Sequence, residues 1–309
     1  MSLDRDAAPR AGGATPAHLH QPGTDRLWGE SWYFDFAAAD GSAGGFVRVG
    51  DYPLLGRRWY WAYVVAGDRA TGYALEVPLT GGRDLPWTAD DPALRFRVEP
   101  GDGGWRLTAD GDGFGLDLTW REQAPPYGYA RGSRMEQSGW AVGEVGLGGA
   151  AFPVEGPGQR DHSWGVRDWW RIGWTWCAGR LSDGTRFQAT HLDARGRIPP
   201  DGYLLAPGDS PQPVDDVAAG EDSLRMNGTV LEFSDIAHVT IELRAPDGRL
   251  SRLRRAMTRV RAVTEPAGRE RDGAGQDGAG QHGAGQHGVV RHGIGWRERN
   301  VPQRQGRRA

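Results

Sequence analysis

The amino-acid sequence predicts an all-β fold made of short antiparallel strands. Alternating apolar and polar runs recur about every 8 to 12 residues from residue 31 onward, as in β-sandwiches and β-barrels. Segments rich in glycine and aspartate, such as 100–104 and 110–113, separate these runs and supply turn residues. No stretch shows a convincing amphipathic-helix periodicity. The fold expected is therefore an antiparallel sandwich or barrel.

The first strand is expected at residues 31–36, because their aromatic content favours a sheet, and Asp40-Gly41 supplies the turn after it. Residues 45–50 complete this hairpin. A third strand is expected at 58–65, and Trp59, Trp61, Tyr63 and Val65 share one of its faces because side chains alternate along a strand. Further strands expected in the first half lie at 71–79, 94–99, 104–109, 114–121, 135–139, 141–147 and 152–155.

The second half continues the same pattern. The Asp247-Gly248 pair is a clear hairpin turn. The run 250–263 carries many Arg residues at mixed spacing, which is compatible with a helix, but we expect a strand there. Strands expected in this half lie at 185–192, 202–205, 223–233, 237–243 and 249–263.

The strand pattern and the composition divide the chain into four parts. Residues 1–24 are rich in Ala, Pro and Gly without periodicity, and we expect a disordered tail. Two β domains are expected at 25–157 and 158–264. Residues 265–309 contain a five-residue repeat of Gly-Ala-Gly-Gln followed by Asp or His, so we expect a second, low-complexity disordered tail. We expect the His residues of this tail to be solvated rather than to form a metal site.

Composition excludes several classes of protein. With 37 basic residues, all of them Arg, against 40 acidic ones, the net charge is -3, so a general nucleic-acid-binding surface is not expected. The single Cys177 excludes an intramolecular disulfide and a cysteine-cluster zinc site. No apolar run reaches the roughly 20 residues of a membrane span, and the start of the chain lacks the apolar core of a signal peptide. We therefore expect a soluble cytoplasmic protein, and the sequence does not indicate its oligomeric state.

Ionisable and indole side chains are concentrated between Gln159 and Phe187. Asp161 and His162 lie between Arg160 and Arg167, and five Trp residues occur from 164 to 176. A carboxylate or imidazole in apolar surroundings must find partners or change its protonation state. The segment is therefore either a satisfied structural network or a chemical site.

The chain resembles the superfamily of hydroxyneurosporene synthase (carotenoid 1,2-hydratase), AttH-like proteins and fungal decalin-forming Diels-Alderases. An Asp-His-Ser-Trp-Gly motif at 161–165 carries the resemblance, together with the Trp-Tyr-Phe-Asp opening strand at 32–35 and a Gly-x-x-x-Gly hairpin at 139–143. An aromatic strand and Leu-Ser-Asp-Gly-Thr at 181–185 follow at similar spacing. The resemblance spans residues 25–263 and is closest to uncharacterised bacterial members.

The resemblance implies two lipocalin-like antiparallel barrels or half-barrels, packed side by side, that meet at a cleft near the motif. The ligand it implies is a large apolar molecule such as an isoprenoid, a steroid-like compound or a polyketide. Members of the superfamily either hydrate an isolated double bond through its protonation or fold a polyene for cyclisation. No cofactor is expected, because the glycine-rich segments connect strands and do not open helices.

Asp161 is the candidate catalytic acid. Indole surroundings disfavour the charged carboxylate, so this side chain can hold a proton near neutral pH, and Trp faces can stabilise a carbocation. The alternative is that Asp161 pairs with Arg160 or Arg167 and only supports the structure.

His162 could relay a proton or position water. Adjacent residues of a strand point to opposite faces, so Asp161 and His162 cannot line one cavity unless a bulge intervenes. A metal site made by His162, His191 and Asp193 matches no strong metal motif, and we expect none.

The ligand walls are expected to be indoles, with about half of them serving as ordinary core instead. Cys177 is expected to be a buried small hydrophobe, because no His is placed to activate it. The candidate ligand-binding residues are Trp59, Trp61, Glu136, Trp164, Trp169, Trp170, Trp174 and Trp176.

These observations predict a protein that binds a large apolar molecule and catalyses acid-assisted hydration or isomerisation of a double bond. Two alternatives use the same pocket. A non-catalytic lipid carrier would need no acid, and a cyclase acting by shape alone would tolerate the loss of Asp161.

Overall fold

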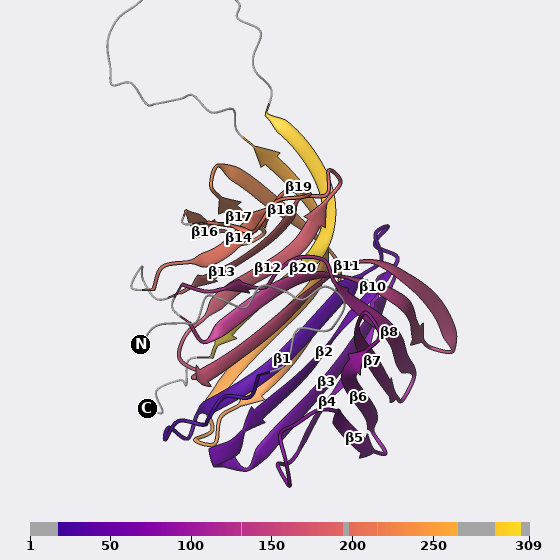
Figure 1. Ribbon diagram of the computed structural model, residues 1–309, viewed down its shortest axis with the longest axis vertical. Helices are drawn as coiled ribbons and strands as arrows, with labels where there is room; N and C mark the ends of the chain where they lie inside the picture. The colour runs from indigo at the N-terminus through magenta and orange to yellow at the C-terminus, as the bar shows by residue number, and fades with distance from the viewer. Residues whose placement is uncertain (1–17, 131, 194–197, 215, 265–287, 304–309) are drawn as a thin grey trace, which may run out of the picture.

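A computed structural model describes residues 18–130, 132–193, 198–214, 216–264 and 288–303 as two curled antiparallel sheets (Figure 1). Apart from one 3-10 turn, η1 (Pro53–Leu55), no helix occurs among these residues. The predicted all-β fold class with two half-barrel sheets is confirmed.

The first sheet has eleven strands in the order β4-β3-β2-β1-β11-β10-β8-β7-β6-β5, with β9 paired to β10. Its strands are β1 (Trp28–Ala37), β2 (Ala43–Tyr52), β3 (Arg57–Ala66), β4 (Arg69–Pro78), β5 (Trp87–Asp91), β6 (Leu94–Gly101), β7 (Gly104–Gly111), β8 (Phe114–Glu122), β9 (Tyr127–Gly128), β10 (Arg134–Leu147) and β11 (Ala150–Val166).

The first sheet curls around its own apolar core. Alternation along β1 places Trp32, Phe34 and Phe36 on the inner face, where they join apolar residues from both halves of the sheet. The rings of Tyr60 on β3 and Phe96 on β6 lie 5.0 Å apart across this interior. Burial of these aromatic side chains stabilises the curl, at roughly 25 cal/mol per Å² of apolar surface removed from water.

The second sheet has nine strands in the order β15-β14-β13-β12-β20-β19-β18-β17-β16. Its inner face holds a second apolar core that includes Cys177, Phe187 and Leu231. Its strands are β12 (Trp174–Leu181), β13 (Arg186–Leu192), β14 (Asp201–Leu205), β15 (Gln212–Pro213), β16 (Val217–Ala219), β17 (Ser223–Met226), β18 (Thr229–Arg244), β19 (Leu250–Thr264) and β20 (Val289–Pro302).

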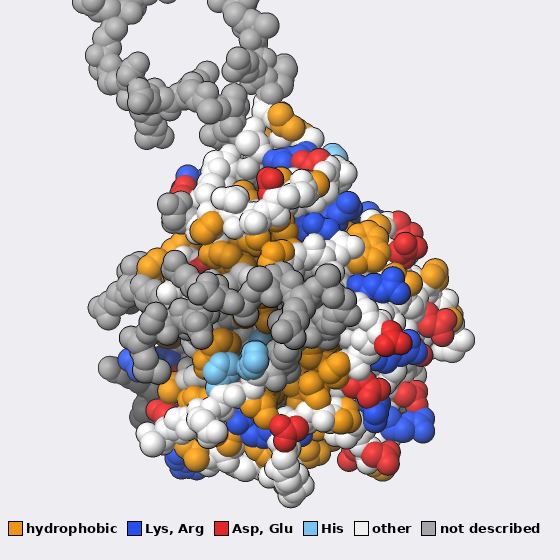
Figure 2. Space-filling model, viewed as in Figure 1, with side chains coloured by type: hydrophobic (Ala, Val, Ile, Leu, Met, Phe, Trp, Pro, Cys, Tyr) orange, Lys and Arg blue, Asp and Glu red, His pale blue; other side chains and the backbone are white. Residues whose placement is uncertain are grey.

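The outer faces of the two sheets pack against each other through a third apolar cluster. In Figure 1, β1 and β11 of the first sheet lie beside β12 and β20 of the second. Trp296 fixes this contact, because its indole Nε1 donates to the carbonyl of Phe36 at 3.1 Å and its ring packs edge-on against Phe46. The described part of the face in Figure 2 has hydrophobic side chains gathered toward the middle and charges of both signs along one side.

The predicted tail at 265–309 is wrong for its later part. Residues 289–302 form β20, which lies between β12 and β19 in the second sheet. Its glycines allow close strand contact: a Cβ on Gly295 would lie 2.2 Å from the carbonyl oxygen of Ala178. The Gly-Ala-Gly-Gln repeats at 273–287, like residues 1–17 of the predicted first tail, lie outside the described residues.

The expected domain boundary at 157/158 also needs correction, because it falls inside β11. The whole motif from Gln159 to Val166 therefore belongs to the first sheet. The single strand expected at 223–233 is a hairpin, since Asn227 and Gly228 both have positive φ and form its turn. Residues 139–143 are no hairpin but the middle of β10. The strand at 250–263 is confirmed as β19.

Candidate functional site

Strand β11 positions the motif between β1 and β10. Asp161 pairs with Tyr33 on β1 and with Glu136 on β10, and His162 is the next residue in the same ladders. No register shift interrupts these pairings, so alternation continues through the motif. Asp161 consequently faces the second sheet, whereas His162 faces the interior of the first, so the two side chains point to opposite faces of β11.

A cavity of about 160 Å³ lies in front of Asp161, between the two sheets. We call it the intersheet cavity. The first sheet contributes Ser31, Tyr33, Arg48, Arg134, Asp161, Ser163 and Val166. The connection to β12 contributes Arg167, Asp168, Trp169 and Ile172. The second sheet contributes Trp174, Thr190, Leu192, Arg255 and Glu298.

Asp161 is held by a cation but keeps one free oxygen. Its Oδ2 forms an ion pair with Arg134, which also donates to Glu136 at 2.7 Å. Its Oδ1 is buried and has no hydrogen-bond partner among the described residues. Since Arg134 holds Oδ2, Oδ1 is the oxygen that can accept a proton from a molecule in the cavity, a role that differs from the proton-donating acid expected from the sequence.

Two carboxyl groups near the motif, those of Asp35 and Glu136, have a raised pKa. Burial raises the pKa of Asp35 to about 8, although its carboxyl accepts hydrogen bonds from the backbone N–H of Gln159 and from the Tyr33 hydroxyl. Burial also raises the pKa of Glu136 to about 7, against the opposing effect of Arg134. Neither side chain lines the intersheet cavity.

Arg48 on β2 is a buried cation that lacks a carboxylate partner. It is only 4% exposed and forms no ion pair with any described residue. Its Cζ lies 4.6 Å from the ring centre of Trp61 and 4.9 Å from that of Trp169. Burial lowers its pKa, and the nearby Tyr52 and Asp161 partly offset this effect. Nothing in the sequence around Arg48 marks it as unusual, and it is not among the residues predicted for the site.

Arg255 on β19 is the second cation in the middle of the site. Its Cζ lies 4.0 Å above the ring of Tyr33, and its Nη2 is ion-paired with Glu298. The Nε and Nη1 atoms of Arg255 have no hydrogen-bond partner among the described residues. Glu298 in turn accepts a hydrogen bond from the indole of Trp174 at 2.5 Å.

Only some of the predicted indole walls reach the cavity. Trp169 and Trp174 line it, with their rings in edge-to-face contact at 5.3 Å. Trp59 and Trp61 lie behind Trp169 and pack against its ring.

Four predicted wall residues have other partners. Trp170 donates to the carbonyl of Leu243, and Trp176 donates to Glu136, so both indoles belong to the packing between the sheets. Glu136 is fully buried behind Arg134. Trp164 points to the other face of β11 and stacks on His20.

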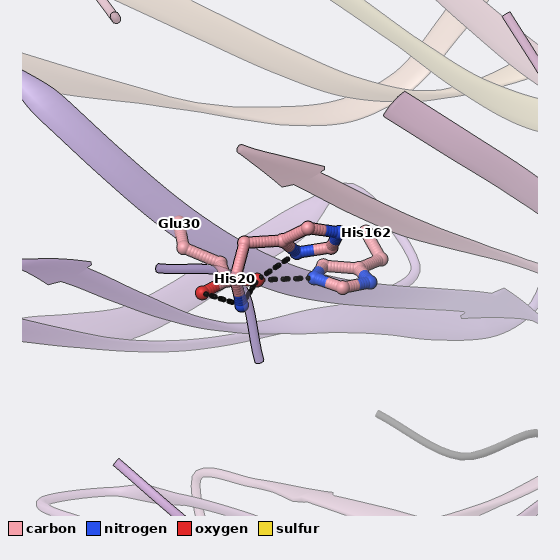
Figure 3. A group of neighbouring side chains, drawn as sticks. All are labelled: His20, Glu30 and His162. Carbon is pink, nitrogen blue, oxygen red and sulfur yellow. Dashed lines mark hydrogen bonds and ion pairs between the residues drawn. The ribbon is translucent and has the colours of Figure 1, made fainter. Parts of the chain in front are cut away.

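His162 belongs to a separate cluster with His20 and Glu30 (Figure 3). His162 Nε2 and His20 Nδ1 lie 2.9 and 2.7 Å from Glu30 Oε1. Within the described ranges, this is the group that could offer three ligand atoms to a metal ion, all within 4.8 Å of one another. Arg83, however, pairs with the second oxygen of Glu30, so the cluster is a closed hydrogen-bond network. It attaches the segment around His20 to the first sheet.

The structure does not assemble the trio of His162, His191 and Asp193. His191, on the second sheet, lies 3.9 Å from Asp193. His162 is on the first sheet and points into the interior of that sheet, away from the second one. Cys177 is buried in the core of the second sheet, and burial raises the pKa of its thiol to about 12. This environment suits the packing role predicted for the cysteine rather than a nucleophile.

A family model described as Domain of unknown function (DUF7064) matches residues 14–282. The fold is similar to that of a putative AttH from Nitrosomonas europaea, with a TM-score of 0.56 and 15% identity over 93% of this chain and 98% of that one. CghA has a TM-score of 0.57 and 13% identity, with 94% and 96% of the two chains covered. Kievitone hydratase from Nectria haematococca has a TM-score of 0.55 and 11% identity over 89% of each chain.

At these identities the similarities show the fold alone, and they confirm the AttH-like architecture inferred from the sequence. Among curated protein sequences, none matches this chain significantly. No described helix has the length and apolar character needed to cross a membrane.

Proposed function

Because the chain belongs to the DUF7064 family, whose description states no activity, we propose a function from the geometry of its intersheet cavity. The protein binds a small molecule there and isomerises a double bond next to a carbonyl group by proton transfer. The free, buried Oδ1 of Asp161 in an indole-lined cavity is the observation that carries this proposal.

The walls support binding of a molecule with an apolar body. Trp169, Trp174 and Leu192 give the cavity an apolar wall, and charged side chains such as those of Arg134, Asp161 and Arg255 line the rest of it. A volume of about 160 Å³ accommodates a one-ring body, since an engineered cavity of roughly this size binds benzene. A larger isoprenoid or polyketide must therefore extend past the rim of the cavity, near the exposed Val166.

The charges support proton transfer by one carboxylate. Asp161 removes a proton from the carbon beside the double bond, and the C–H electron pair shifts to form the new double bond. The negative charge that develops on the carbonyl oxygen faces Arg255, whose Nε and Nη1 are free to donate. Asp161 then returns the proton to the far carbon of the former double bond, so the reaction needs no cofactor and is balanced.

Two of the structural relatives are consistent with chemistry on small molecules. One is a hydratase by name, and CghA has been crystallised with Sch210972.

Deuterium incorporation tests the proposal even while the substrate is unidentified. The protein is purified from its own host, the molecule that remains bound is detected by native mass spectrometry, and the complex is incubated in D₂O. The wild-type protein is expected to incorporate deuterium into the ligand. Asp161→Asn should reduce the rate by about 10²-fold or more while retaining the ligand, since a positioned base contributes roughly that factor.

Asp110→Asn is the matched control, because Asp110 is an exposed carboxylate on β7 that pairs with Arg95 and does not line the cavity. It should exchange at the wild-type rate. A product heavier by one water molecule would establish hydration instead, and a bound ligand without exchange would identify a carrier. The absence of any bound or acceptable ligand would overturn the binding proposal itself.

A further inference from the structure

We propose that the ligand of the intersheet cavity is a carboxylic acid whose carboxylate binds to Arg48. This inference rests on the proposed function, because it names the chemical class of the molecule that occupies the same cavity. It assigns Arg48 to ligand recognition, whereas Asp161 and Arg255 act on the double bond.

The burial of Arg48 without an anion is the first observation. A guanidinium cannot lose its proton under ordinary conditions, so it has to be solvated or paired. Arg48 is 4% exposed, and its Nη1 is buried without a hydrogen-bond partner among the described residues. Its polar neighbour is the neutral Tyr52 hydroxyl, so an anionic ligand would supply the missing counter-charge.

The fixed orientation of the guanidinium is the second observation. Arg48 lies against the rings of Trp61 and Trp169, which restrict its planar group from two sides. The backbone beside it leaves space for this arrangement, since a Cβ on Gly50 would lie 2.4 Å from Nη1 of Arg48. A guanidinium that is already oriented loses little freedom when it binds a planar, two-oxygen anion such as a carboxylate.

The charge balance around the cavity is the third observation. Four guanidinium groups and three carboxylates line it. Asp161 is paired with Arg134, Glu298 with Arg255, and Asp168 with Arg249, while Arg167 donates to the carbonyls of Ser133 and Trp164. Arg48 is thus the cation of the lining for which the described residues provide neither a carboxylate nor a backbone carbonyl.

Matched acid and amide pairs test this inference. Cinnamate and cinnamamide, decanoate and decanamide, and 2-naphthoate and 2-naphthamide are titrated into the full chain at neutral pH by calorimetry. Each pair has the same carbon skeleton, and only the acid is charged. The wild-type protein is expected to bind at least one acid about 10-fold or more tightly than its amide, as a charge-assisted hydrogen bond allows.

Arg48→Gln should remove this preference and leave the Kd of the amide unchanged. Arg252→Gln, an exposed residue paired with Glu242 on β18, is the control and should keep the preference. The melting temperature of Arg48→Gln without ligand, measured beside that of the wild-type protein, shows whether the variant stays folded after losing the contacts of the guanidinium with Trp61 and Trp169. If it does not fold, Arg48→Lys provides the second test, since it keeps the charge but loses the planar fork.

The outcomes separate the two proposals. Equal binding of acid and amide by the wild-type protein would overturn the carboxylate inference and leave the ligand-binding proposal intact. A preference that survives in Arg48→Gln would overturn the role of Arg48. Failure of every pair to bind, together with the absence of a co-purifying ligand, would overturn the proposed function.

Discussion

At the scale of single residues, Asp35 shows how burial changes the protonation of a side chain. Its carboxyl is buried beneath Tyr33, near Arg255 and Glu136, and burial raises its pKa from the ordinary 3.8 to about 8. Between these two values the folded protein holds a proton that the unfolded chain releases. The free energy of unfolding contributed by this group therefore falls as the pH rises through that window.

Replacement of Asp35 by Asn should remove this dependence. An amide cannot ionise. Its oxygen can replace Oδ1 and accept from the Gln159 N–H, while its NH2 group replaces Oδ2 and can donate to the Tyr33 hydroxyl oxygen. Relative to the wild-type protein, Asp35→Asn should gain about 1 kcal/mol of stability per pH unit between pH 5 and pH 8, since one pKa unit corresponds to about 1.4 kcal/mol. Urea unfolding at four pH values measures the difference. A difference that stays constant with pH would show that Asp35 is ionised throughout.

Some residues of the site could be predicted from the sequence. Strand alternation correctly separated Asp161 from His162, and composition singled out Trp169 and Trp174, which do line the cavity. The pKa shifts of Asp35 and Glu136 and the isolation of Arg48 depend on which partners other strands bring near, so local sequence does not reveal them. Asp35 could have been named as a candidate from the sequence, because it ends the Trp-Tyr-Phe-Asp motif of the opening strand.

At the scale of elements, β20 shows the limit of composition as a guide. The strand follows a repetitive glycine-rich segment and contains Gly293 and Gly295, so its sequence looks like part of a tail. Both glycines face a neighbouring backbone, however, and Ile294 and Trp296 are buried. The short turns and alternating strands were predictable because their signals are local. The position of β20 was not, because it depends on pairing with distant strands.

Substitution of Gly295 by Ala should destabilise the second sheet. Its Cβ would lie 2.2 Å from the carbonyl oxygen of Ala178, and backbone on a central strand cannot move aside cheaply. We expect a loss of about 2 kcal/mol or more in the free energy of unfolding, at the level of other overpacking changes. Gly128→Ala is the control, since a Cβ there meets nothing within 4 Å. Equal stability of the two variants in urea unfolding would argue against the central place of β20.

At the scale of the whole molecule, the intersheet cavity depends on both sheets. Tyr33 and Asp161 come from the first sheet, and Trp174, Arg255 and Glu298 from the second. The apolar cluster around Trp176 and Trp296 joins the same strands directly behind the site. The resemblance stated from the sequence anticipated such a cleft, but the boundary at 157/158 assigned the motif to the wrong sheet, because β11 runs without a break past that point.

The shared cluster and the shared cavity predict that the two sheets unfold together. A ligand of the cavity binds only when both sheets are folded, so it should raise the midpoint of a single calorimetric transition by an amount set by its concentration relative to its Kd.

Trp296→Ala removes a buried indole and its hydrogen bond to Phe36 between the sheets, and should cost about 3 to 5 kcal/mol of stability. The same change should weaken ligand binding although Trp296 does not line the cavity. Two separate transitions in the wild-type protein, only one of which shifts with ligand, would mean that a single sheet holds the ligand and that the packing between the sheets does not shape the site.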